Sequence, residues 1–263
     1  MSVSEQLLEI FKHGVSSVQP NNILDNFIKV KSKKIIVTEG SKQKIYSKIN
    51  RVFPVCIGKA SVDMAKKIKK IFKVSNFKIE KGILIVNKEN FSKVKGFKCF
   101  SSGHPIPNRN GLDASIFLEN YLGKLEKNDL VLIFISGGGS ALAPYPVDGI
   151  SLEEKIIINK ILLESGANIK EINIVRKHLS KLKGGNLVKI CNPAYVHSFI
   201  LSDVIGDDLS SIASGMTTYD NSTFRDVKKI LNKYKIWTKI PKNIKNHINN
   251  GEKKKGTRDP RKK

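Results

Sequence analysis

Three consecutive glycines give the sequence its strongest chemical signal. Gly137, Gly138 and Gly139 lie between Ser136 and Ser140 and follow an apolar stretch. Because glycine has no Cβ, consecutive N–H groups in such a run can turn toward one anion, so the run favours a phosphate-binding loop. It lacks the Gly-Lys-Ser/Thr ending of a Walker A loop and the spacing of a dinucleotide-binding GxGxxG motif. The spacing alone leaves a simple flexible turn open as the alternative.

Lys59 and His104 are candidates for charge and proton chemistry. Lys59 follows Gly58 at a predicted junction of strand and helix, where a helix N-terminus already favours phosphate. Its ammonium could offset the charge that builds on a transferred phosphoryl group. His104 lies in a loop rich in glycine and proline, where an imidazole could exchange protons. A surface role for the lysine and a structural role for the histidine remain open.

A second polar loop contains three carboxylates. Asp203, Asp207 and Asp208 follow the apolar stretch Tyr195–Leu201. Carboxylates at the end of a strand suit a hard cation such as Mg²⁺, so Asp203 and Asp207 are predicted metal ligands. A turn whose aspartates accept hydrogen bonds from the backbone is the competing interpretation.

A basic stretch with two glycines follows a short predicted helix. Arg176 could hold a carboxylate in its planar fork, which predicts contact with the substrate. Lys183 and Gly184 come shortly after it and are predicted to contact a nucleotide. A solvated helix face is the alternative.

Apolar stretches between these polar loops indicate the elements that position them. Predicted strands include Val52–Ile57, Gly82–Val86, Leu130–Ile135 and Tyr195–Leu201. Leu130–Ile135 is apolar on both faces, as expected for a strand in the middle of a parallel sheet. Strands that alternate with helices predict an α/β fold, a three-layer Rossmann-like lobe with a largely parallel sheet. Ligands bind such sheets beyond the carboxyl ends of the strands, where the glycine and aspartate loops are predicted.

The two ends of the chain differ from this pattern. An N-terminal helix is predicted from Ser4, as its cap, and from Leu7, Ile10 and Phe11 at helical spacing. After Pro241 the sequence is polar and rich in lysine, without an evident apolar face. We therefore predict one lobe over residues 1–240 and a disordered tail or linker over residues 241–263.

The composition narrows the function classes. The net charge is +24, but only six of the 47 basic residues are arginine, and residues 129–220 hold 8 basic and 10 acidic side chains. The motifs therefore do not lie in the basic part of the chain, and no nucleic-acid partner is predicted. No apolar stretch is long enough to span a bilayer and no secretory signal is visible, so we expect a cytoplasmic protein with no membrane partner. The three scattered cysteines predict neither a disulfide framework nor a zinc site.

Taken together, five segments resemble the glycerate kinases that carry a C-terminal MOFRL domain. The segments are Gly58–Ala60, Ser102–Asn108, Leu130–Leu142, Asn173–Gly185 and Leu201–Gly215. The resemblance implies phosphorylation of a small-molecule substrate, glycerate, with ATP and Mg²⁺, usually at the 2-hydroxyl. It also implies that Lys59 is catalytic and that the triple-glycine loop lies in a cleft between two lobes.

The full prediction assigns a role to each of these residues. Lys59 is catalytic, Gly137 to Ser140 bind the nucleotide with Lys183 and Gly184, and Ser136, Arg176 and His104 contact the substrate. The resemblance further implies a second lobe that supplies a catalytic arginine, which we do not find before Lys263. A binding lobe that needs a separate MOFRL-like chain or a homo-oligomer is therefore one alternative. A hydroxypyruvate reductase is the other.

Overall fold

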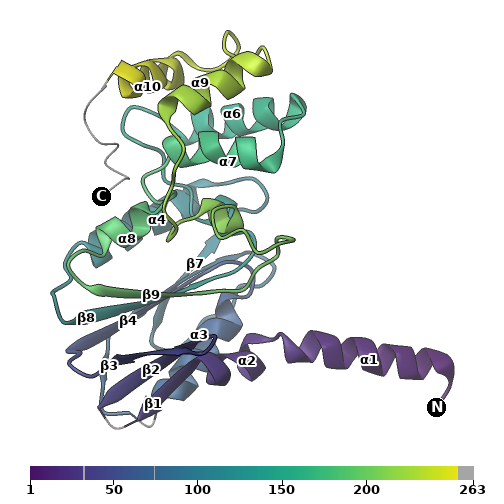
Figure 1. Cartoon of the computed structure of the whole chain (residues 1–263), viewed down its shortest axis with the longest axis vertical. Helices are drawn as coiled ribbons and strands as arrows, with labels where there is room; N and C mark the ends of the chain where they lie inside the picture. Colours follow the sequence, from purple (N-terminus) through teal and green to yellow (C-terminus); the bar gives the residue numbers. More distant parts are fainter. Residues whose placement is uncertain (32, 74, 254–263) are drawn as a thin grey trace.

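The centre of the molecule is a parallel sheet (Figure 1). The structure is a computed structural model that describes residues 1–31, 33–73 and 75–253. The strands run in the order β7-β6-β4-β8-β9, and every pair is parallel. They are β4 (Arg51–Ile57), β6 (Gly82–Asn87), β7 (Phe97–Ser102), β8 (Asp129–Ile135) and β9 (Tyr195–Ile200), and the short β5 (Lys78–Ile79) pairs with β4. The predicted α/β fold with a largely parallel sheet is confirmed.

β8 shows why the fold has three layers. The strand lies between β4 and β9 and is buried along its whole length, as its apolar sequence predicts. Val131, Ile133 and Ile135 pack with α4 (Arg109–Leu122) on one face. Alternate residues of the strand pack with α3 (Ser61–Phe72) on the other face. Successive strand side chains point to opposite faces, so one apolar strand joins both layers.

A second group of helices lies beyond the sheet (Figure 1). It comprises α6 (Leu152–Glu164), α7 (Ile169–His178), α9 (Phe224–Lys233) and α10 (Lys242–Lys253), which share an apolar cluster of their own. Shorter elements connect this group to the sheet: α5 (Gly139–Leu142), α8 (Asn186–Ile190) and the 3₁₀ turn η1 (Ile212–Ser214). α6 and α7 therefore stand opposite the loops that leave the strands.

The helix α10 corrects the prediction of a tail without an apolar face. Ile244 and Ile248 are fully buried and join the helical cluster, together with Ile240. Their spacing of four residues places them on one side of the helix, where they pack toward α9. Many lysines and asparagines around these isoleucines hid the pattern, and the boundary predicted at residue 240 falls inside a packed unit. Residues 254–263, the rest of the predicted tail, lie outside the described residues.

The N-terminal helix forms as predicted but begins earlier. In α1 (Val3–Ser17) the cap is Ser2 rather than Ser4, because Ser2 Oγ accepts a hydrogen bond from the Glu5 amide. The helix extends away from the body, and its apolar side chains are exposed (Figure 1). After α2 (Pro20–Phe27) comes a small antiparallel sheet of β1 (Ile28–Lys31), β2 (Lys34–Glu39) and β3 (Lys42–Tyr46). Over the described residues, no helix has the length and apolar character that a membrane crossing requires.

Candidate functional site

A cavity of about 630 Å³ lies between the strand ends and the helices α6 and α7. Loops after β7, β8 and β9 form one wall, and α6 and α7 form the opposite wall. Such a position is where ligands bind in α/β sheets. The polar side chains of the walls are those of His104, Ser140, Lys155, Asn159, Lys160, Glu164, Asn173, Arg176, Lys183, Asp203 and Ser211.

The triple-glycine loop, Lys59 and His104 lie against one another. Gly138 has a left-handed φ of +84°. A Cβ on it would lie 3.0 Å from His104 Cδ2 and 3.2 Å from Lys59 Cε. The Lys59 amide also donates to the Gly137 carbonyl at 2.9 Å. The structure thus brings together Lys59 and Gly138, which are far apart in the sequence, because β4 and β8 are neighbouring parallel strands.

The aspartate loop reaches the same place through one of its predicted ligands. A Cβ on Gly137 would lie 2.1 Å from Asp203 Oδ2, and Asp203 lines the cavity. Asp207 is exposed and is not among the lining residues. Asp208 accepts hydrogen bonds from the hydroxyls of Ser211 and Ser210, which lower the pKa of its carboxyl. In the described part of the chain, no three His, Cys, Asp or Glu side chains are grouped to hold a metal ion.

Ser136 does not line the cavity, unlike the prediction that it contacts substrate. Its side chain is buried, and its Oγ accepts a hydrogen bond from the Ala60 amide at 3.0 Å. A Cβ on Gly58 would lie only 2.2 Å from this Oγ. Ser136 therefore joins the loop after β8 to the turn that carries Lys59.

Removing the Ser136 hydroxyl should weaken this junction. We expect Ser136→Ala to lower the free energy of unfolding by about 1 kcal/mol, because the Ala60 amide loses its partner. Urea unfolding followed by circular dichroism measures the change. Ser4→Ala, at an exposed position of α1, is the control and should not lower the midpoint. An unchanged midpoint for Ser136→Ala would show that water replaces the hydroxyl at no cost.

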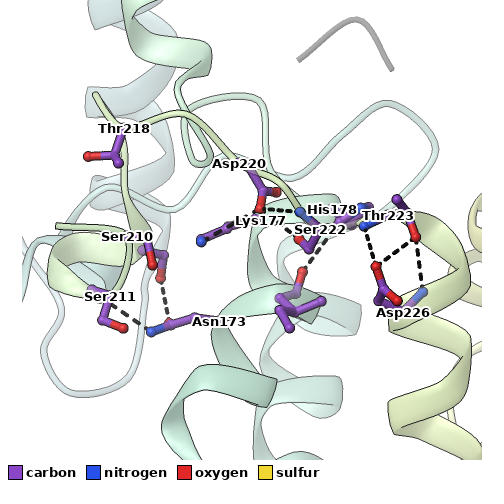
Figure 2. Close-up of polar contacts among 12 residues, drawn as sticks. Asn173, Lys177, His178, Ser210, Ser211, Thr218, Asp220, Ser222, Thr223 and Asp226 are labelled. Atoms are coloured by element: carbon purple, nitrogen blue, oxygen red, sulfur yellow. Dashed lines mark hydrogen bonds and ion pairs between the residues drawn. The ribbon is translucent and has the colours of Figure 1, made fainter. Parts of the chain in front are cut away.

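Polar contacts tie α7 to the loop after β9 (Figure 2). Asn173 Nδ2 donates to the Ser211 carbonyl at 3.4 Å, and Ser214 Oγ donates to Asn173 Oδ1 at 2.9 Å. Ser140 Oγ lies 2.9 Å from Ser214 Oγ. Ser214 has a left-handed φ of 55°, a strained conformation that these bonds help to hold. The chain of side chains fixes the end of the glycine loop relative to α7.

The same loop is anchored further along by a buried ion pair. Lys177 Nζ lies 3.7 Å from Asp220 Oδ1, and both side chains are almost fully buried (Figure 2). Gly184 lies beside this pair, and its amide donates to the Ser214 carbonyl at 3.2 Å. Gly184 is not among the residues that line the cavity. Its predicted contact with the nucleotide therefore has no support in this geometry.

Three basic side chains form part of the cavity wall. Arg176 Nε donates to Asn159 Oδ1 at 3.0 Å, and Lys183 Nζ donates to the Ser140 carbonyl at 3.0 Å. Lys155, which the sequence reasoning missed, donates to the Leu179 carbonyl at 2.9 Å. The missed signal was a lysine on the buried face of α6, whose other buried residues are apolar.

Burial shifts the titration of these groups. Burial, with a smaller contribution from Arg176, lowers the pKa of Lys155 to about 7. Burial also lowers the pKa of Lys183 well below its usual value, and Lys155 and Arg176 add to the effect. The pKa of His104 is lowered by burial first and by Lys59 second, so its imidazole is largely neutral at pH 7.

Comparisons with known proteins show the family to which the chain belongs. The family described as "Domain of unknown function (DUF4147)" matches residues 6–249. The chain is 39% identical over 251 residues to a glycerate 2-kinase of Pyrococcus horikoshii, covering 95% of this chain and 55% of the relative. A crystal structure of a P. horikoshii protein superposes with a TM-score of 0.86 at 38% identity, covering 96% of this chain and 56% of that one.

A crystal structure of glycerate kinase from Thermotoga maritima superposes with a TM-score of 0.79 at 35% identity, covering 93% of this chain and 54% of that one. The chain therefore spans about half the length of the relatives it matches. Nearly all of its residues lie within the family match. The chain belongs to the DUF4147 family and is related to proteins named glycerate kinase.

Proposed function

We propose that this chain carries the nucleotide- and substrate-binding part of an ATP-dependent glycerate kinase that phosphorylates the 2-hydroxyl. The observation that carries the proposal is that His104, Gly138 and Asp203 line one cavity and that Lys59 lies beside Gly138. The relatives named glycerate kinase supply the reaction class. Phosphoryl transfer needs mainly positioning and neutralisation of charge, which these residue types provide.

The glycine loop is the proposed phosphate site. Over the described residues, the amides of Gly137, Gly138, Gly139 and Ser140 donate to no backbone carbonyl. These N–H groups are therefore available to phosphate oxygens. Gly137 and Gly139 are closely packed, so neither position has room for a side chain. A Cβ on Gly137 would lie 2.1 Å from Asp203 Oδ2, and a Cβ on Gly139 would lie 3.0 Å from Ala213 Cβ.

Lys59 and His104 are the proposed partners of the reacting groups. The Lys59 ammonium balances charge on the transferred phosphoryl group. The neutral His104 can accept a proton from the attacking hydroxyl, since its pKa is lowered. Both side chains lie beside the same glycine, so the hydroxyl and the phosphate would meet there.

The donors present fit a Mg²⁺ ion bound together with nucleotide phosphates. Asp203 places one carboxylate against the glycine loop. Mg²⁺ at such sites takes one or two carboxylates and completes its shell with phosphates and water. The ion would neutralise phosphate charge there. Asp207 is not part of this proposal because it lies away from the cavity wall.

Two assays separate this proposal from its alternatives. With D-glycerate, ATP and Mg²⁺ we expect release of ADP and formation of a phosphoglycerate. A coupled assay measures the ADP, and ³¹P spectroscopy identifies the phosphoglycerate. Oxidation of NADH with hydroxypyruvate, and no ADP release, would favour the reductase. Binding of ATP and glycerate without turnover would favour a binding lobe that needs a second chain. A 3-phosphoglycerate product would contradict the assignment to the 2-hydroxyl.

A further inference from the structure

Three basic side chains lie together at the cavity. Lys155 comes from α6, Arg176 from α7 and Lys183 from the loop that follows α7. The two lysines are 2% and 1% exposed. Each of the three donates to a neutral oxygen, a backbone carbonyl or the amide of Asn159.

The cluster has no close counter-charge of its own. Among residues 1–31, 33–73 and 75–253, no carboxylate lies within 4 Å of any of the three basic groups. Glu164 and Asp203 line the same cavity without forming an ion pair with them. Burying a cation without a partner is unfavourable, and an anion in the cavity would relieve that cost.

The cluster retains donors for such an anion. A lysine ammonium has three N–H donors and an arginine guanidinium has five. Lys155 donates to one acceptor in the structure, Arg176 donates through its Nε, and Lys183 donates to the carbonyls of Ser140 and Ala143. The remaining donors, including the outer edge of the Arg176 fork, suit the two oxygens of a carboxylate.

We propose that Lys155, Arg176 and Lys183 form an anion subsite that binds the carboxylate of the small hydroxy acid, an inference that rests on the proposed function. An in-line transfer requires the hydroxyl of the acid to face the phosphate at the glycine loop. Its carboxylate then faces the other wall, where this cluster lies. Lys183 donates to the Ser140 carbonyl, so the cluster adjoins the loop and one small molecule can contact both.

Titration calorimetry on the full chain tests the subsite with D-glycerate, glycerol and ATP as probes. We expect Lys155→Met to weaken D-glycerate about 10–100-fold, the usual range for losing a hydrogen bond to a charged group. ATP should bind unchanged, and glycerol, which has no carboxylate, should bind weakly to both proteins. Methionine matches the length of lysine, and circular dichroism checks that the variant folds. Arg176→Lys, which keeps the charge and loses the fork, should also weaken D-glycerate.

The matched control is Lys160→Met. Lys160 lies on the same helix and borders the same cavity, but its side chain is 74% exposed. The variant makes the same change of residue type and should leave D-glycerate affinity within about twofold, because an exposed charge contributes little. A loss equal to that of Lys155→Met would mean that net charge matters rather than the buried cluster, which would overturn the proposal.

The remaining outcomes distinguish failure of the proposed subsite from failure of the proposed kinase function. Equal D-glycerate affinity in Lys155→Met and the unaltered chain would overturn the subsite and leave the proposed function standing. Weaker ATP with unchanged D-glycerate would show that the cluster holds phosphate, which overturns the carboxylate assignment. If the unaltered chain binds lactate or tartronate but not glycerate, and Lys155→Met loses that binding, the subsite stands and the glycerate assignment fails. Binding of none of these acids would overturn both.

Discussion

Replacing Lys59 with alanine should lower kcat for glycerate phosphorylation by about 10²–10³-fold, the usual cost of removing one electrostatic donor from a transition state. KM should change much less, because the ammonium meets the developing charge mainly as transfer proceeds. Lys59→Arg should restore activity only in part, since a planar fork replaces a compact ammonium. The initial rate of ADP release, measured over a range of glycerate and ATP concentrations, gives both constants.

Two controls test whether a loss of activity in Lys59→Ala comes from the catalytic step rather than from lost charge or lost folding. Lys124→Ala removes an exposed lysine after α4, outside the cavity wall, and should leave kcat unchanged. Lys59 is exposed, so Lys59→Ala should unfold at the same urea concentration as the unaltered protein. If the chain alone does not turn over, the measurement is made after joining it to the part of the P. horikoshii relative that it does not cover. Near-normal kcat in Lys59→Ala would remove the residue from the mechanism.

The same substitution has a spectroscopic readout that needs no turnover. The Lys59 charge is the second cause, after burial, of the lowered pKa of His104. In Lys59→Ala the pKa of His104 should rise toward its usual value, which NMR titration of the imidazole can follow. A rise would confirm that the two side chains share an electrostatic environment.

The turn that carries Lys59 should tolerate no side chain at Gly58. We expect Gly58→Ala to lower the free energy of unfolding by roughly 3–5 kcal/mol, which combines a strained backbone with overpacking. Gly58 has a φ of +132°, and its Cβ would lie 2.2 Å from Ser136 Oγ and 2.6 Å from the Ser136 carbonyl oxygen. The backbone oxygen cannot move aside as a flexible side chain could. Urea unfolding followed by circular dichroism measures the loss.

Gly96→Ala separates the cost of the strained backbone from the cost of overpacking. Gly96 has a φ of +94°, and a Cβ there would have no heavy atom within 4 Å. This variant should lose only about 1–2 kcal/mol, the cost of the backbone conformation alone. Equal losses in the two variants would show that the contact with Ser136 is relieved by a small shift of the chain.

The sequence predicted the parallel sheet and the polar loops at the carboxyl ends of its strands, because both depend on local patterns. Leu130–Ile135 is apolar at every position, and such a run is stable only where both faces of a strand are covered. Parallel strands have their carboxyl ends on one edge, so the loops that begin at Gly58, Ser136 and Leu201 had to meet there. The positions of Lys59, Gly138 and Asp203 follow from this topology.

The tertiary structure decided which side chains face the cavity. Ser136 and Gly137 are neighbours, yet Ser136 turns inward to the Ala60 amide and leaves the cavity wall to Gly138 and Ser140. Lys155 was missed because a lysine in a helix is usually solvated, and only the packing of α6 against α7 buries this one. The spacing of Ile244 and Ile248 places them on one side of α10, and only packing against α9 buries them. A local pattern fixes the period of an element, but the direction of each side chain relative to a cavity depends on neighbours that are distant in the sequence.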